Sequence, residues 1–438
     1  MTVRKANSSN KSKLGLKELI AMGIGGMVGG GIFSVLGLAV AEAGHAAPVA
    51  FALGGIVALL TGWSYIRLGL HFHSDGGSFT YLEHAFKHPN IAGIGGWLLL
   101  TGYIGTLALY AYTFGAYGGA LLGSANHAPA VQHALESFVM LAFLGLNLYG
   151  IRAAGIAEDL TVAFKLLILL VFAVAGLCFI KADHVLPLFN QGSLGLVIGA
   201  GLIFVAYEGF ELIPNAVNEM QHPRRDLGRS ILISISITAV IYVLVSLVAV
   251  GNLLPAEIAR YKEYALAVAA KPFLGAVGFT LIAIAALLST ASAINATMFG
   301  TARLGMVMAR EKALPKAFSL KERRKDIPWV SLLVITATAL VFVNTTDLTI
   351  ISSFASSTFL AIFAAINLSA LRLRRRIGIT AAVPLAGIVL CIASGLTLLA
   401  YLWKSDLRAF VWIAGLYTAV VAAEFLFSER RLLFRRCR

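Results

Sequence analysis

The stretch Gly23-Ile-Gly-Gly-Met-Val-Gly-Gly-Gly-Ile-Phe33 interrupts the first long apolar block of the chain. Each glycine costs a helix roughly 1 kcal/mol relative to alanine, so Gly29, Gly30 and Gly31 together favour local unwinding. Unwinding would expose backbone N–H groups at the start of a second half-helix, where the helix dipole favours a carboxylate. The alternative interpretation is close packing, because small residues give membrane helices a smooth contact face.

A second interruption lies in the sixth apolar block, in the stretch Gly201-Leu-Ile-Phe-Val-Ala-Tyr-Glu-Gly-Phe-Glu-Leu-Ile-Pro214. Glu208 and Glu211 flank Gly209 among apolar residues, and Pro214 removes one backbone hydrogen bond. Carboxylates at membrane depth usually face a polar cavity, a cation or a proton path. The alternative is a helix that ends early, with both acids near the membrane interface. Paired interruptions of this kind indicate a transporter with a central binding site.

Composition predicts a membrane protein. Of 438 residues, 59% are hydrophobic and 13% are charged, whereas soluble domains carry about 25% charged residues. The apolar residues form twelve blocks, and a helix needs roughly 20 apolar residues to cross a bilayer. The sequence therefore predicts an all-α integral membrane protein with twelve transmembrane helices. The blocks are 19–41, 49–70, 94–122, 134–149, 160–180, 194–213, 231–253, 273–308, 329–343, 350–371, 382–402 and 409–427.

The basic residues predict the orientation in the membrane. If the N-terminus lies inside, the inside segments contain more than four times as many Lys and Arg residues as the outside loops. Cytoplasmic loops are expected to show this excess of basic residues. We therefore expect both termini in the cytoplasm, a place in the cell (inner or plasma) membrane, and contacts between basic clusters and anionic lipid heads. The net charge of +14 is split among short clusters, which argues against a nucleic-acid partner. The three cysteines have neither disulfide nor metal spacing.

Lys165 lies within the fifth apolar block, about 10 Å along the helix from Glu158. Burial disfavours the charged form of an amine, so Lys165 would be able to gain and lose a proton. The alternatives are snorkelling to the cytoplasmic headgroups or a fixed ion pair. In the eighth block, Ser289 and Thr290 supply hydroxyls that either face this amine or bond to carbonyls of their own helix.

Several motifs together resemble the amino acid, polyamine and organocation transporter superfamily, in particular its archaeal-type, proton-coupled amino-acid transporters of broad specificity. The motifs are Gly29-Gly-Gly-Ile-Phe33, Phe164-Lys-Leu-Leu-Ile-Leu169, Gly209-Phe-Glu211, Ala265-Leu-Ala-Val-Ala-Ala-Lys-Pro-Phe-Leu-Gly275 and Met308-Ala-Arg-Glu-Lys-Ala-Leu-Pro315. The resemblance covers nearly the whole chain.

The resemblance implies a LeuT-type fold, a five-plus-five inverted repeat with two extra C-terminal helices, which works by alternating access. The first repeat would span residues 19–180 and the second 194–371. Helices 11 and 12 would span 382–427. A cytoplasmic leader (1–18) and a basic tail (428–438) would flank the helices.

The same resemblance implies a site. Gly29, Gly30 and Gly31 would donate backbone N–H groups to a substrate carboxylate. Carbonyls around Phe204, Val205 and Glu208 would receive its ammonium group, with Phe210 in the same pocket. Lys165 matches a lysine whose amine takes the place of sodium in sodium-coupled relatives, and Ser289, Thr290 and Glu211 complete the predicted proton-coupling site. The coupling ion would be a proton, with no cofactor and no metal.

Glu208 departs from the family pattern, in which the matching residue is generally uncharged. A negative charge at this position would favour cationic or simple amine substrates and disfavour acidic ones. It would alternatively carry the proton itself and leave Lys165 a structural role.

The sequence thus predicts a proton-coupled symporter of amino acids or related small amines, as a monomer or homodimer among membrane lipids. An exchanger without net proton movement is the alternative. An enzyme is not expected, because the sequence offers no catalytic constellation. A non-transporting membrane sensor is a remote alternative, since no loop or tail is long enough for a signalling domain.

Overall fold

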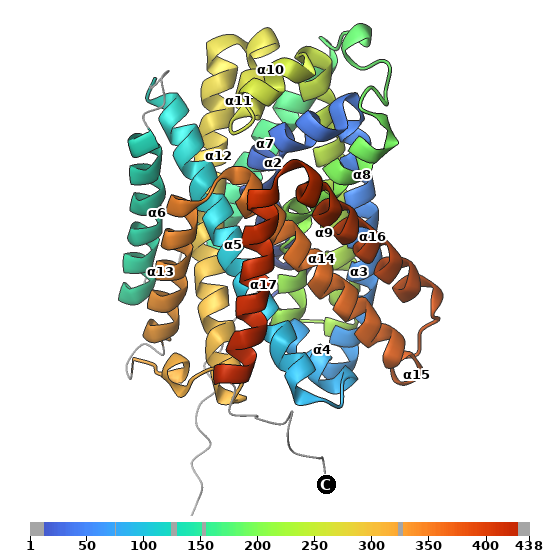
Figure 1. Ribbon diagram of the computed structural model, residues 1–438, viewed down its shortest axis with the longest axis vertical. Coiled ribbons are helices and arrows are strands. Elements are labelled where there is room, and N and C mark those ends of the chain that lie inside the picture. The colour runs from blue at the N-terminus through green and yellow to red at the C-terminus, as the bar shows by residue number, and fades with distance from the viewer. Residues whose placement is uncertain (1–12, 75, 124–128, 151–154, 323–326, 428–438) are drawn as a thin grey trace, which may run out of the picture.

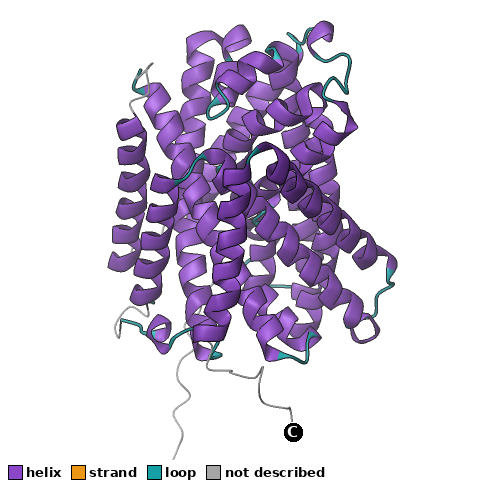
Figure 2. Cartoon of the chain, viewed as in Figure 1, coloured by secondary structure: helices purple, strands orange, loops and turns teal. Residues whose placement is uncertain are grey.

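The computed structural model describes residues 13–74, 76–123, 129–150, 155–322 and 327–427. Within these ranges the chain is helical and has no strand (Figure 2), although Leu14 and Met220 form an isolated parallel bridge. Most of the predicted leader and the whole predicted tail lie outside the described residues.

Each predicted apolar block coincides with one or more helices (Figure 1). The first six blocks correspond to α1 (Leu16–Met27) with α2 (Gly31–Ala43), α3 (Ala47–Phe72), α5 (Pro89–Leu121), α6 (Pro129–Tyr149), α7 (Gly155–Leu177) and α8 (Gly192–Leu202) with the 3-10 helices η3 (Ile203–Tyr207) and η4 (Phe210–Glu219). The last six correspond to α9 (Pro223–Asn252), α12 (Lys271–Arg310), α13 (Trp329–Thr345), α14 (Leu348–Arg372), α16 (Ala382–Ser405) and α17 (Leu407–Phe427).

Short helices connect the long ones. They are α4 (Gly77–Ala85), α10 (Pro255–Arg260), α11 (Ala265–Ala269), α15 (Arg374–Ile377), and the 3-10 helices η1 (Gly44–Ala46), η2 (Ala182–His184) and η5 (Lys316–Ser319). In Figure 1, α4 and α15 lie at one end of the molecule, whereas α10 and α11 lie at the opposite end. These four short helices therefore lie at the two opposite ends of the long helices.

Ten helical stretches of the described chain are long and apolar enough to cross a membrane. One of them, Gly31–Phe72, joins α2 and α3 through η1, and α13, with 17 residues, is shorter than the ten. The all-helical membrane fold is confirmed, while the count of twelve crossings remains a prediction.

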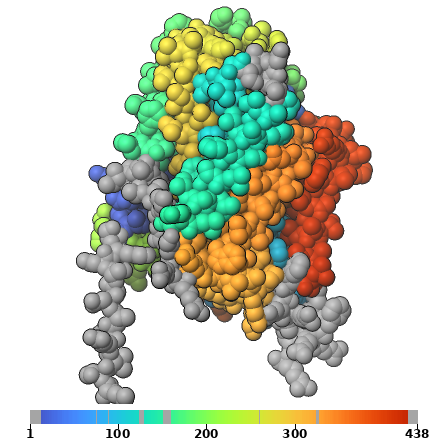
Figure 3. All heavy atoms as spheres, turned by 90° about the vertical axis from the view of Figure 1, so that its left-hand side faces the viewer, coloured from blue at the N-terminus to red at the C-terminus, as the bar shows by residue number. Residues whose placement is uncertain are grey.

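Burial separates central from peripheral helices. In the stretch from α8 to η4, 83% of the apolar window is buried, against 22% in each of α6, α16 and α17. Figure 3 shows part of the periphery, where α6 and α13 lie side by side. The interrupted sixth helix therefore lies at the centre of the bundle, where polar backbone is shielded from lipid.

Candidate functional site

The first predicted membrane helix, called helix 1 and formed by α1 and α2, is broken where the sequence predicted; the sixth, called helix 6, is formed by α8, η3 and η4. α1 ends at Met27, Val28 leaves the helical conformation with ψ 57°, and α2 begins at Gly31. Helix 6 is broken as well: Glu208 is extended (φ −65°, ψ 145°) and Gly209 has φ +124° between η3 and η4. Only glycine adopts such a φ without strain, so Gly209 defines the second break.

The two breaks lie in direct contact. A Cβ atom added to Gly209 would lie 2.5 Å from the carbonyl carbon of Gly26, and one added to Gly31 would lie 2.6 Å from the Cα atom of Ala206. Backbones can come this close only where both contact positions lack a bulky side chain. Glycine therefore serves both predicted purposes here, unwinding of the helix and close packing.

Lys165 of α7 reaches the end of α1. Its Nζ atom donates to the carbonyl oxygens of Gly25, at 3.0 Å, and Val28, at 2.5 Å. Ser289 of α12 donates to the same Val28 oxygen at 2.6 Å. The side chain is 0% exposed, so it does not snorkel. The last carbonyls of a helix carry partial negative charge and lack partners within the helix, which makes this a suitable place for an ammonium group.

The two acids of helix 6 face α5. Glu208 contacts the hydroxyl of Thr106, and Glu211 accepts hydrogen bonds from the backbone N–H of Gly209 at 2.8 Å and the hydroxyl of Tyr103 at 3.2 Å. Both acids are buried, at 3% and 1% exposure. Both acids are therefore enclosed by protein rather than exposed on its surface.

Comparison with known proteins identifies the family. The family model described as amino acid permease matches residues 14–423. The chain belongs to the amino acid permease family. The permease is 33% identical to an uncharacterized protein of Methanocaldococcus jannaschii and 32% identical to the inner membrane transport protein YbaT of Escherichia coli. These alignments cover 95% of both chains in the first case, and 93% of this chain and 94% of YbaT in the second.

A solved structure shows the same fold. The crystal structure of a manganese transporter from Eremococcus coleocola superposes with a TM-score of 0.59, covers 97% of this permease and 96% of the transporter, and shares 15% of the sequence. That likeness concerns the LeuT-like fold alone. Family membership makes the chain a multi-pass secondary transporter of amino acids or related substrates, and not an enzyme.

The predicted carboxylate site of the permease is covered. Gly29, Gly30 and Gly31 are buried, and the ring of Tyr110 packs on the first two, with Cβ positions 2.8 and 2.7 Å from its atoms. The Tyr110 hydroxyl lies 3.4 Å from the carbonyl oxygen of Gly26. Tyr110 therefore packs directly against two of the three glycines of this predicted site.

The part of the site predicted to bind the substrate ammonium group, around Phe204 and Val205, contacts α14. Ser356 accepts from the backbone N–H of Val205 at 3.0 Å and donates to the carbonyl of Leu202 at 2.7 Å. Phe204 and Phe210 are buried and both contact the ring of Phe363, with centroids 5.6 and 5.2 Å away.

Among the predicted coupling residues, Lys165 and Ser289 meet at one carbonyl, but the hydroxyl of Thr290 does not join them. It donates to Ala286 of its own helix at 2.8 Å. A threonine in a helix readily satisfies its hydroxyl in this way. Glu211 contacts Gly209 and Tyr103, as described above, and so belongs to the acid pair on the α5 side.

Four residues outside the broken helices that contact the breaks are not predicted from the sequence. Tyr242 of α9 is the clearest case, because its hydroxyl contacts the carbonyl oxygens of Met27, at 2.7 Å, and Ala206, at 3.0 Å, and so joins both broken helices. The other three are Tyr110, Thr106 and Ser356. Single hydroxyl residues are common in apolar helices, so no local pattern marks these four.

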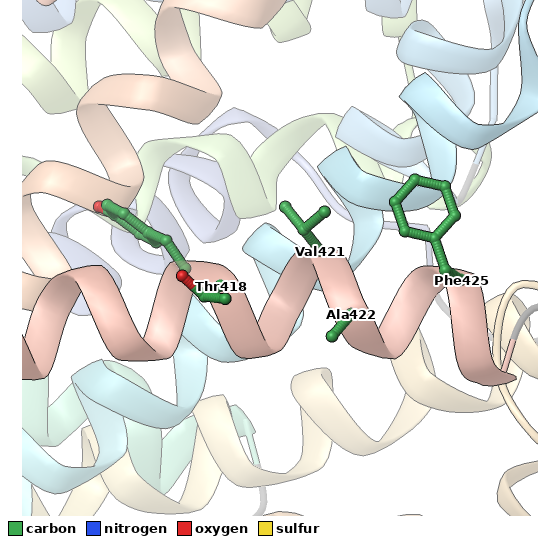
Figure 4. Close-up of a pocket in the computed structure, with 5 residues that line it drawn as sticks. Thr418, Val421, Ala422 and Phe425 are labelled. Carbon is green, nitrogen blue, oxygen red and sulfur yellow. The ribbon is translucent and has the colours of Figure 1, made fainter.

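A groove lies on the outer surface of α17, well removed in sequence from either break (Figure 4). Tyr417, Thr418, Val421, Ala422 and Phe425 line it, and Val421 and Phe425 point to the same side of the helix. All five come from one peripheral helix, so this groove is not the site formed by the two breaks.

Proposed function

We propose that the permease is a proton-coupled symporter of amino acids or related small amines, located in the cell membrane with both termini cytoplasmic. The observation that carries the proposal is the contact of the Lys165 amine with the Gly25 and Val28 carbonyls at the end of α1. The orientation rests on the charge bias of the loops, and the four-arginine cluster at Arg372–Arg376 lies at the α15 end of the molecule.

Protonation of Lys165 changes the strength of that contact. A charged donor forms hydrogen bonds roughly twice as strong as those of a neutral one. The ammonium form therefore ties α7 to the break of helix 1, and loss of the proton loosens the tie. A two-state transporter responds to any ligand that favours one state, so proton binding at Lys165 would bias which side of the membrane the cavity faces.

Substrate would bind between the two breaks. Its carboxylate would meet the N–H groups of Gly29 to Gly31 once Tyr110 moves aside, and its amine would meet carbonyls near Phe204 and Val205. Tyr242 contacts carbonyls of both broken helices, so movement at one break would be felt at the other.

Uptake by the purified permease in proteoliposomes tests this proposal. The standard amino acids and simple amines, radiolabelled, serve as individual probes. Acid outside should drive accumulation of at least one probe into vesicles that contain no solute, and collapse of the pH gradient with a protonophore should abolish it. Uptake that ignores the gradient and requires unlabelled solute inside the vesicles would instead establish an exchanger.

A further inference from the structure

Glu208 and Glu211 form a buried acid pair in the break of helix 6. Neither acid forms an ion pair within 4 Å with a lysine, arginine or histidine of the described chain. Two buried carboxylates three residues apart in apolar surroundings repel one another and lose their hydration. At least one of them is therefore expected to hold a proton.

The contacts of Glu211 suit a carboxylate. Its Oε2 atom accepts from the Gly209 N–H at 2.8 Å, and its Oε1 atom accepts from the Tyr103 hydroxyl at 3.2 Å. Each oxygen thus has a donor, and hydrogen bonds to the charged form favour ionisation. Glu211 is therefore the acid of the pair whose ionised form is better stabilised by hydrogen bonds.

Glu208 has fewer hydrogen-bond donors than Glu211. The Thr106 hydroxyl donates to the Oε2 atom of Glu208, and the same hydroxyl lies 3.2 Å from the carbonyl oxygen of Gly102, one helical turn earlier. A threonine hydroxyl has a single hydrogen. Glu208 therefore has one donor, which it shares with Gly102, whereas Glu211 has two, so Glu208 is less stabilised as a carboxylate and is the acid expected to hold the proton.

We propose that Glu208 is a second proton-binding group of the permease, protonated in this conformation, and that Thr106 is its positioning residue. The proposal rests on the proposed proton coupling and deepens it. Lys165 approaches helix 1 from α7, whereas Glu208 faces α5 across helix 6. A neutral Glu208 also removes the reason to expect a preference for cationic substrates while the proton is bound.

The groups around Glu208 explain why it would release that proton on opening. The titratable groups that act on it or on its partner acid are one carboxylate and three phenols, namely Glu211, Tyr103, Tyr110 and Tyr65. The phenols are neutral at physiological pH, so Glu211 supplies the negative charge that retains the proton. Entry of water between the breaks would screen that charge and hydrate the ionised form of Glu208.

Infrared spectroscopy of the purified permease at neutral pH tests this assignment directly. The wild-type spectrum should contain the carbonyl stretching band of a protonated carboxyl group, and Glu208→Gln should lose that component. Glu257→Gln, at an exposed position on α10, is the matched control and should leave the band unchanged. Thr106→Val should shift the band because its hydrogen-bond partner is lost, and Thr106→Ser should restore its position.

A wild-type spectrum without such a component, or one that Glu208→Gln leaves intact, would overturn the inference. The Thr106 pair gives an independent reading if Glu208→Gln fails to fold: an identical band in Thr106→Val and Thr106→Ser would also overturn it. Failure of the proposed function is seen separately, as wild-type vesicles that show no uptake driven by a pH gradient.

Discussion

Replacement of Gly209 by alanine would act on the contact between the two broken helices. The added Cβ atom would lie 2.5 Å from the carbonyl carbon of Gly26 and 2.6 Å from the backbone nitrogen of Met27. Carbon atoms in contact sit about 3.5–4.0 Å apart, so the helices would have to separate by about 1 Å. The φ of +124° adds strain of about 1–3 kcal/mol for a residue with a side chain.

We therefore expect Gly209→Ala to lose at least about 2 kcal/mol of stability and most of its transport. Thermal unfolding in detergent, followed by tryptophan fluorescence, measures the first, and uptake into proteoliposomes measures the second. Gly119→Ala is the matched control, because nothing lies within 4 Å of its Cβ position in α5. An unfolding midpoint and uptake rate equal to wild type in Gly209→Ala would refute the described contact between the breaks.

Two further variants test the hydroxyls that hold the breaks. Tyr242→Phe removes a hydroxyl that contacts carbonyls of both broken helices. It should lower the stability of the permease by about 0.5–1.5 kcal/mol, measured from the unfolding midpoint, and should slow the initial rate of uptake. An unchanged uptake rate would show that Tyr242 does not couple the two breaks. Ser356→Ala removes the side-chain partner of the Val205 N–H and the Leu202 carbonyl and should lower the stability by about 1–3 kcal/mol, measured by thermal unfolding. The control is Ser405→Ala, whose exposed hydroxyl bonds within its own helix. Equal unfolding midpoints in the two serine variants would contradict the capping role of Ser356.

Much of the fold followed from physical features visible in the sequence. Apolar blocks of membrane length became helices, since a backbone in lipid must satisfy its hydrogen bonds internally. The breaks followed from Gly29 to Gly31 and from Gly209, because glycine is the residue that unwinds a helix and adopts positive φ. Lys165 stood out because a buried amine needs a partner.

The remainder depends on which helix faces which. Tyr242 of α9 contacts a carbonyl at the break of helix 1, and Ser356 of α14 accepts from an N–H group at the break of helix 6. These roles arise only from packing between segments far apart in the chain. Thr290 shows the opposite case, in which a suitably placed hydroxyl turns to its own helix. The short helices α4, α10, α11 and α15 were missed because they are too short for a periodic pattern to emerge.

The central claim, that the proton on Lys165 couples the pH gradient to solute movement, is tested most directly by uptake measurements on Lys165→Ala. The control is Lys404→Ala, at an exposed position near the end of α16. Both variants should elute as folded protein in gel filtration. Accumulation driven by acid outside should vanish in Lys165→Ala and persist in Lys404→Ala. Full, pH-dependent accumulation by Lys165→Ala would contradict the account.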